Sequence, residues 1–307
     1  MPNLPDPVTL AVPAFVLLVI AEMIFIRVTG RGRFEARDCA TSLTMGIGNL
    51  VSKLAFGGVA LAWFTLIEPF KLFDLGWSWW VWILCFVFDD FLYYVWHRTA
   101  HRVRWFWADH VVHHSSQHYN LTTALRQPWL GVVTMSFIVF GTWQVLLGFP
   151  IAMIAFCGAL NLVYQFWIHT ETIGRMPAWF EAVMNTPSHH RVHHATNPRY
   201  LDRNFAGVFI IWDRMFGTFQ AERRSDPCRY GIIHNLTTFN PLIIATHEYW
   251  GILRDVFRSR SPGQALSHIL RPPGWSPDGS WDTADMIRAR WQAREASEGR
   301  PDPRAHG

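Results

Sequence analysis

Long apolar blocks separated by short polar stretches are the feature that most constrains the fold of this chain. Residues 8–26 are apolar except for Glu22, and residues 77–96 form a second long block that is rich in Trp and Phe. Because about 20 consecutive apolar residues carry a helix across a bilayer, both blocks predict membrane spans. Half of the residues are hydrophobic and 17 are Trp, which also indicates a membrane protein.

Further blocks bring the expected number of spans to about four to five. Residues 43–67 form a weaker candidate with polar interruptions, and residues 129–168 form a pair of spans broken at Gly148-Phe149-Pro150, which predicts a hairpin. The first block lacks the basic start and the cleavage site of a signal peptide, so we expect a retained helix. The expected fold class is all-α, an integral membrane helical bundle.

The second half of the chain has a different character. From Pro198 onward no block is long enough to cross a membrane, and residues 205–219 mix apolar side chains with Asp213 and Arg214, so we expect them to lie in the membrane interface. We assign residues 1–260 to one membrane-embedded domain. Residues 261–307 are expected to form a polar C-terminal tail that is partly disordered.

Histidines gather in two short windows of the sequence. Of the 15 histidines, nine lie in residues 97–114 or in residues 189–194. His97 and His101 are four residues apart, so their rings project from one face of a helix. The same three-and-four spacing recurs in two triplets, which are His110, His113, His114 and His190, His193, His194.

Such clusters predict a metal site that holds more than one ion. Buried imidazoles packed together without a metal leave ring nitrogens unpaired, at about 1–3 kcal/mol each. Imidazole suits iron, copper, nickel and zinc, and the clusters supply enough ligands for two ions. Zinc hydrolysis of the HExxH type is disfavoured, because Arg98 stands where that motif has its glutamate. A redox-active pair of irons that activates O2 uses all of the clustered histidines, and the membrane setting implies a lipid substrate.

Asp90 is a candidate for orienting a metal ligand. It lies seven residues before His97 on the same helical face, and metal-bound imidazoles commonly donate their second N–H to a carboxylate. The alternative is a carboxylate at a helix end that faces lipid headgroups. The isolated histidines, in contrast, are interpreted as ordinary core or interface residues; they are His118, His247, His268 and His306.

Charge distribution gives an expected orientation. Four arginines lie in residues 27–37, directly after the first block, and the positive-inside rule places that loop in the cytoplasm. Counting spans from there brings all of the histidine clusters to the cytoplasmic face, of the inner membrane in a bacterium or of the endoplasmic reticulum in a eukaryote. The net charge is only +4 and forms no basic patch, so no nucleic-acid partner is expected. The four scattered cysteines predict neither disulfides nor a thiolate site.

The histidine boxes carry a family resemblance. HRTAH (97–101), HVVHH (110–114) and HRVHH (190–194), set after apolar blocks, resemble the fatty acid hydroxylase and sterol desaturase superfamily of membrane di-iron oxygenases. Longer runs are similar to the alkylglycerol monooxygenase family, which cleaves glyceryl ether lipids with tetrahydrobiopterin. These runs are HSSQHYNLTTALRQ (114–127), YQFWIHTE (164–171), NTPSHHRVHHATNP (185–198) and IIWDRMFGTFQAE (210–222).

The resemblance implies the site residues and the cofactor. It implies a catalytic domain with two Fe ions held by the three boxes, and a further ligand, His169, between the second and third boxes. Gln165, His189 and Asp90 are then expected around the ligands, with His189 as an alternative ligand. The full set of implied ligands is His97, His101, His110, His113, His114, His169, His190, His193 and His194.

The resemblance leaves the electron donor and the substrate open. Arg102 follows the first box, where the animal ether-cleaving enzymes carry a glutamate, so the donor is either a tetrahydropterin or a redox protein. The expected function is an O2-dependent oxygenase that hydroxylates a lipid C–H bond and so cleaves the ether bond of alkylglycerol-type lipids. The alternatives are a sterol or fatty-acyl hydroxylase or desaturase, and a non-catalytic membrane protein that binds a metal such as zinc.

Overall fold

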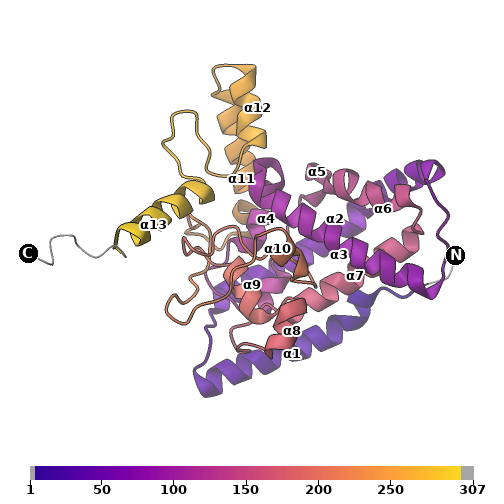
Figure 1. Cartoon of the computed structure of the whole chain (residues 1–307), viewed down its shortest axis with the longest axis horizontal. Helices are drawn as coiled ribbons and strands as arrows, with labels where there is room; N and C mark the ends of the chain where they lie inside the picture. Colours follow the sequence, from indigo (N-terminus) through magenta and orange to yellow (C-terminus); the bar gives the residue numbers. More distant parts are fainter. Residues whose placement is uncertain (1–3, 299–307) are drawn as a thin grey trace, which may run out of the picture.

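The computed structural model describes residues 4–298, and within them the chain is built from helices and loops with no strand. Three long helices and a set of shorter ones pack into one bundle, from which α11 and α12 project (Figure 1). In chain order the elements are α1 (Pro7–Thr29), α2 (Ala36–Ile67), η1 (Glu68–Phe70), α3 (Trp79–Arg102), α4 (Arg104–His114), η2 (Leu121–Leu125), α5 (Gly131–Thr134), η3 (Phe137–Gly141), α6 (Thr142–Leu147), α7 (Ile151–Trp167), α8 (Ala178–Val183), α9 (Pro187–His193), α10 (Ile211–Met215), α11 (Pro241–Phe257), α12 (Pro262–Leu270) and α13 (Ala284–Glu298).

The expected all-α membrane bundle is confirmed. Three helices, α1, α2 and α3, are long and apolar enough to cross a membrane, and the two stretches Phe137–Leu147 and Ile151–Trp167 are shorter apolar helices. Asp6 caps the start of α1 by accepting hydrogen bonds from the amides of Val8 and Thr9, and Gly30 ends the helix in the left-handed conformation. The chain is an integral membrane protein.

The second span is longer than the sequence indicated. α2 has 32 residues, which is about 48 Å of helix, whereas the hydrocarbon core of a bilayer is about 30 Å thick. Its buried residues, which include Asp38, Ser42 and Met45, all lie in the first ten positions. This first part of α2 therefore packs inside the protein, against η2 and α11. The remainder has no fully buried residue and packs at the surface against α6 and η3.

The expected hairpin is present, but its first arm is not one continuous span. α5, the π-helix η3 and α6 occupy residues 131–147, with Met135 in the left-handed conformation between α5 and η3. Gly148 makes the turn into α7 with a φ of 93°. A Cβ at this position would lie 1.9 Å from the carbonyl oxygen of Phe73, so only glycine fits there.

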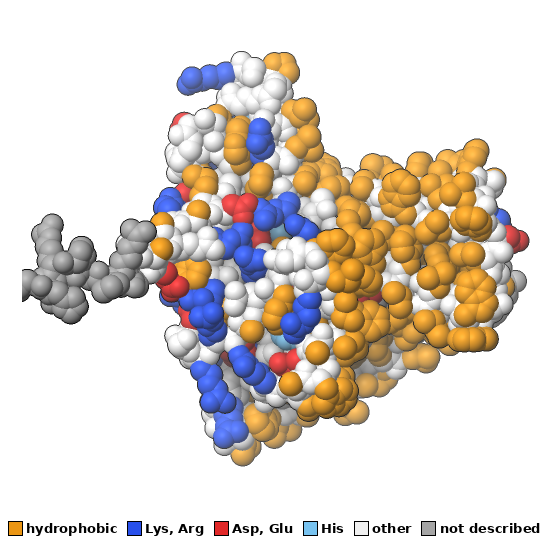
Figure 2. Space-filling model, in the orientation of Figure 1, with side chains coloured by type: hydrophobic (Ala, Val, Ile, Leu, Met, Phe, Trp, Pro, Cys, Tyr) orange, Lys and Arg blue, Asp and Glu red, His pale blue; other side chains and the backbone are white. Residues whose placement is uncertain are grey.

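The surface divides into two regions. Apolar side chains cover the end of the molecule formed by the long helices, whereas Lys, Arg, Asp and Glu side chains gather at the other end (Figure 2). His97 and His101 lie in the last turns of α3, so that helix runs through the apolar region and ends in the polar one. The histidine boxes therefore lie where the apolar belt gives way to polar surface.

Residues 205–219, expected at the membrane interface, divide into a largely buried part and an exposed part. Phe205, Ala206, Val208, Ile210 and Asp213 are all buried, and the segment is a loop with one short helix, α10. The apolar side chains of residues 205–210 lie mostly in the protein interior, whereas Met215 and Phe216 are 65% and 45% exposed. The interfacial position of the end of the segment stays a prediction.

The expected boundary after residue 260 stays a prediction. α12 and α13 occupy much of the tail, and α12 packs against α4 and α11. The disorder expected at the chain end and His306 lie outside the described residues.

Candidate metal centre

The structure brings nine histidines together in two groups that adjoin each other. The side-chain nitrogens of each group lie within 4.8 Å of one another, and every ring is buried. The rings of His114 and His194, one from each group, stack with their centroids 4.3 Å apart. The five-histidine group is His97, His101, His110, His114 and His193, and the four-histidine group is His113, His169, His190 and His194.

Helical spacing explains how each element serves both groups. In α4, His110 and His114 are one turn apart and belong to the five-histidine group, while His113 is rotated toward the other group. At the end of α9, the neighbours His193 and His194 divide in the same way. Adjacent residues on a helix diverge by about 100°, so one short helix can feed two ions.

Backbone carbonyls fix the orientation of four of the rings. Nδ1 of His97 donates to Phe205 O at 2.7 Å, and Nδ1 of His193 donates to Arg203 O at 3.0 Å. In the four-histidine group the corresponding acceptors are Arg126 O for His113, at 3.3 Å, and Gln165 O for His169, at 2.7 Å. A carbonyl oxygen only accepts, so Nδ1 carries the proton in each ring, and Nε2 of the neutral imidazole carries a lone pair.

These tautomers bring lone pairs face to face. Nε2 of His113 lies 3.1 Å from Nε2 of His169, and neither nitrogen has a proton to place between them. Two opposed lone pairs in a buried site repel unless a cation lies between them, either a proton or a metal ion. Burial lowers the pKa of His113 to about 4 and that of His169 well below its ordinary value, so a proton is disfavoured at neutral pH. A metal cation is the remaining choice.

The spacing of the nitrogens fits metal coordination. A metal–nitrogen bond of about 2.1 Å separates neighbouring ligands of an octahedral ion by about 3.0 Å. The closest Nε2 pairs in the five-histidine group, which link His97 to His110 and His110 to His114, are 2.8 and 3.0 Å apart. In the four-histidine group, Nε2 of His190 lies 3.0 Å from that of His169 and 3.3 Å from that of His194.

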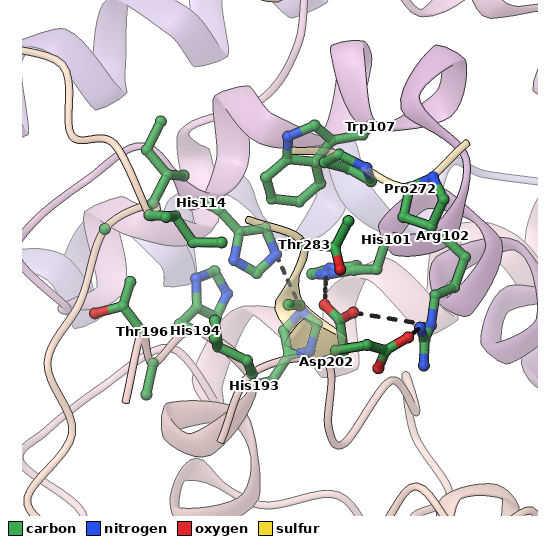
Figure 3. A pocket seen from close by; sticks show the side chains of 18 residues that line it. His101, Arg102, Trp107, His114, His193, His194, Thr196, Asp202, Pro272 and Thr283 are labelled. Atoms are coloured by element: carbon green, nitrogen blue, oxygen red, sulfur yellow. Dashed lines mark hydrogen bonds and ion pairs between the residues drawn. The ribbon is translucent and has the colours of Figure 1, made fainter. Parts of the chain in front are cut away.

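One side of the five-histidine group opens into a small pocket of about 60 Å³. There Nδ1 of His101 lies 3.3 Å from a carboxylate oxygen of Asp202, and its buried Nε2 has no partner among the described residues (Figure 3). Asp202 also lies 3.8 Å from the guanidinium of Arg102, which is hydrogen-bonded to Asp285 of α13. Sequence reasoning missed Asp202, although it lies in a polar run just after the third box.

Asp90 supports the site, but not by the contact expected from the sequence. Among the described residues it contacts no imidazole; its carboxylate accepts hydrogen bonds from the amides of Val208 and Phe209 and from the indole of Trp212, at 2.7–2.9 Å. These residues follow Phe205, whose carbonyl orients His97. The proposed carboxylate–histidine contact is therefore wrong, because the loop carbonyl takes that place.

A second buried carboxylate holds the same loop from its other side. Asp213 accepts from the amides of Phe205 and Ala206, each at 2.8 Å, and burial raises its pKa to about 6. Asn204 adds hydrogen bonds to the carbonyls of His189 and Gln220, and it adopts a φ of 55°. The sequence signal for Asp213 was its position in the run 210–222, one of the runs that carry the family resemblance.

Gln165 and His189, the other two residues expected around the ligands, have different positions relative to the histidine groups. Gln165 orients His169 through its backbone carbonyl, and its side chain donates to Asn161 at 2.7 Å. His189 belongs to neither group: its ring packs against Phe219, and its Nε2 lies 3.9 Å from a carboxylate oxygen of Glu181. The alternative of His189 as a ligand gains no support from this geometry.

Comparison with known proteins bears on this centre. Residues 82–218, which contain all nine grouped histidines, match the fatty acid hydroxylase family. These residues form a fatty acid hydroxylase domain. The resemblance expected from the histidine boxes is thereby confirmed.

Sequence relatives extend beyond this domain. The chain is 39% identical over 280 residues to an alkylglycerol monooxygenase of Homo sapiens, covering 90% of this chain and 61% of that protein. It is 37% identical over 277 residues to an alkylglycerol monooxygenase of Caenorhabditis elegans, covering 86% and 54%. An ornithine lipid hydroxylase of Rhizobium tropici is 27% identical over 151 residues, covering 49% and 45%. The chain thus spans about 61% of the human relative's length, and no solved structure matches it.

The role of Asp90 in holding the loop that orients His97 can be tested directly. We predict that Asp90→Asn lowers metal affinity about 10–100-fold, because an amide cannot accept from two backbone N–H groups and an indole as a carboxylate does. The matched control is Asp89→Asn, since Asp89 accepts only side-chain amides, from Gln144 and Asn161. Metal retention against a graded chelator measures the effect, and equal retention in the two variants would contradict the prediction.

Proposed function

We propose that this chain is a membrane-bound di-iron oxygenase that uses O2 to hydroxylate a lipid C–H bond next to an ether oxygen. The proposal rests on the two buried groups of histidines inside a fatty acid hydroxylase domain, and on the Nε2 lone pairs of His113 and His169 that face each other within one of these groups. The identity of 39% to an alkylglycerol monooxygenase supports an alkylglycerol-type lipid as the substrate.

The two histidine groups divide the work of binding. The five-histidine group would hold one iron and the four-histidine group the other, and when bound the iron pair supplies the redox chemistry that activates O2. The chain's own part is to present Nε2 atoms with free lone pairs without rearrangement, because backbone carbonyls have already fixed four of the rings. Trp107 covers the five-histidine group from the pocket side, with its ring 5.0 Å from that of His101, and so limits the access of water.

The reaction balances with one external two-electron donor. One oxygen atom of O2 becomes a hydroxyl on the carbon next to the ether oxygen, and the other leaves as water with two electrons and two protons from the donor. The product is a hemiacetal, which collapses to a fatty aldehyde and a free glycerol hydroxyl. The donor is a tetrahydropterin or a redox protein. Arg102 stands where the animal ether-cleaving enzymes carry a glutamate, which argues against a pterin, whereas Asp202 and Asp285 still supply two carboxylates to the pocket.

We predict that the purified chain binds close to two irons, and that His113→Ala and His193→Ala each lower the iron content by about half or more. Each substitution removes one buried ligand from one group, whereas the matched control His118→Ala removes a partly buried histidine outside both groups. Elemental analysis of protein from iron-replete cells measures this. A single zinc per chain would support the non-catalytic alternative instead. Full iron content in both boxed variants would overturn the ligand assignment.

We further infer that the histidine end of the bundle faces the cytoplasm. The arginine-rich loop between α1 and α2 lies at that end, since the amide of Asn120 donates to Arg33 O at 3.2 Å. A pair of cysteine variants tests this: Ser225→Cys on an exposed loop of the polar region and Asp74→Cys in the exposed turn between α2 and α3. An impermeant maleimide applied to intact cells should label only the second variant, and the reverse pattern would overturn the orientation.

The substrate prediction follows from the same centre. Membranes that contain the protein, supplied with a 1-O-alkylglycerol and either a tetrahydropterin or a ferredoxin system, should release a fatty aldehyde in an O2-dependent manner. The aldehyde should be lost in His113→Ala, because that variant removes a ligand. Aldehyde is measured as its hydrazone by mass spectrometry.

The same assay separates the alternatives. A cholesterol 25-hydroxylase-like protein of Danio rerio is 29% identical over 146 residues, so a sterol and a free fatty acid are included as competing substrates. If these are hydroxylated while the alkylglycerol is untouched with both donors, the ether-lipid assignment fails and the lipid oxygenase class remains.

A further inference from the structure

A large cavity lies beside the pocket that reaches the histidines. It has a volume of about 710 Å³, within the range of about 300–1,000 Å³ that small-molecule sites occupy. The histidine pocket itself has only about 60 Å³ and cannot hold a lipid headgroup together with a reacting carbon. Four residues line both spaces, so the two are separated only by shared walls; they are Trp107, Ile232, Ile233 and Pro273.

Aromatic rings and two unpartnered ring nitrogens line the cavity. Trp275 packs edge-on against His268, with the ring centroids 5.2 Å apart. Nδ1 of His268 and Nε2 of His247 are buried and have no hydrogen-bond partner within the described residues. His268 is only 8% exposed, so its Nδ1 lacks the hydrogen-bond partner that a buried polar atom normally has. Both residues would ordinarily be interpreted as core histidines, and their unmet hydrogen bonds argue otherwise.

The least exposed charge along the cavity, that of Arg104, is already paired. Arg104 donates through Nε to Glu248 at 2.6 Å and through Nη1 to Asp255 at 2.7 Å, so two carboxylates offset its charge and disfavour a phosphate beside it. A hydroxyl group both donates and accepts, so it satisfies an imidazole nitrogen in either tautomer. The flat faces of Trp107 and Trp275 suit the C–H groups of a small polyol. These features fit an uncharged, hydroxyl-bearing headgroup.

The cavity also reaches the apolar surface of α11. Trp250 lines it and is 69% exposed, in a stripe on α11 that continues with Leu253 and Phe257. Leu266 and Leu270 extend exposed apolar surface along α12. In Figure 2 apolar side chains of this projection turn toward the belt of the long helices. A lipid at the membrane interface can therefore meet the cavity edge without leaving its apolar surroundings.

We propose that this cavity binds the hydroxyl-bearing headgroup of a single-chain lipid and positions the first carbon of its alkyl chain at the histidine pocket. This inference rests on the proposed function and names the part of the protein that selects the substrate. Leu201, Ile232 and Pro273 supply the apolar wall against which that carbon lies. His247 and His268 bind the headgroup hydroxyls.

Photolabelling of the full chain in nanodiscs tests the location. The probe is a 1-O-alkylglycerol with a diazirine close to its headgroup, and labelled peptides are mapped by mass spectrometry. We expect label on α11 and on residues 272–282, in competition with unlabelled 1-O-hexadecylglycerol. Label confined to the groove between α3 and α7, where Trp96 and Phe140 line a separate space of about 280 Å³, would overturn the proposal.

A matched pair of variants tests the headgroup contact. His268→Phe keeps the aromatic packing on Trp275 but removes the ring nitrogens, so we expect the Kd for 1-O-hexadecylglycerol to rise about 5–10-fold with unchanged iron content. His118→Phe, at a histidine outside the cavity, should leave the Kd unchanged. An unchanged Kd in His268→Phe overturns the proposal. The proposal is also overturned if a 1-O-alkyl phosphocholine binds the wild type more tightly than 1-O-hexadecylglycerol does and its Kd does not change in His268→Phe.

These readouts distinguish the site from the reaction. Labelling and binding are measured without turnover, so a chain that labels on α11 and residues 272–282 but releases no aldehyde retains the headgroup site and loses the proposed reaction. A chain that releases aldehyde and labels elsewhere retains the reaction and loses the site.

Discussion

The opposed lone pairs of buried imidazoles constrain the rest of this structure. Where His113 faces His169 at 3.1 Å, both Nδ1 atoms are committed to backbone carbonyls, so the contact is repulsive until a cation joins it. Such a site cannot form by itself from flexible side chains, because each ring would turn to pair its own nitrogens. The backbone must therefore hold the rings in place, and it does so through the carbonyls of Arg126, Gln165, Arg203 and Phe205.

Buried carboxylates explain how a loop can be rigid enough for that purpose. Asp90 and Asp213 together accept four backbone amides of residues 205–209, which positions the carbonyl that orients His97. Glu22 does similar work near the other group, since it accepts from the amide of Leu121 and from the hydroxyl of Thr170, the residue after His169. Each carboxylate lies on or beside a helix that is packed elsewhere, so the loops inherit the stiffness of the bundle.

Sequence alone predicted the bundle and eight of the nine grouped histidines because both depend on local spacing, whereas His169 was implied by the family resemblance. Apolar length fixed α1 and α3, and three-and-four spacing gathered His110, His113 and His114 on one helix. Sequence reasoning failed where the partner of a residue is distant in the chain. Asp90 was assigned to His97, seven residues later on the same helical face, although its amide partners lie 118 and 119 residues later. The burial of residues 205–208 was missed for the same reason, since apolar side chains that face a membrane and those that face a core look alike in a sequence.

The depth of the histidine centre relative to the bilayer limits which C–H bonds of a bound lipid it can reach. The histidines lie where α3 passes from the apolar belt into the polar end of the molecule, so a lipid bound there has its tail on one side of the boundary and its headgroup on the other. The carbons nearest the headgroup are the ones that stay at this boundary, whereas the middle and the end of an alkyl chain remain deeper in the bilayer. An oxygenase centred at this depth therefore favours C–H bonds close to a headgroup linkage. A carbon next to an ether oxygen meets that condition in every chain length, because its distance from the headgroup does not change with the tail.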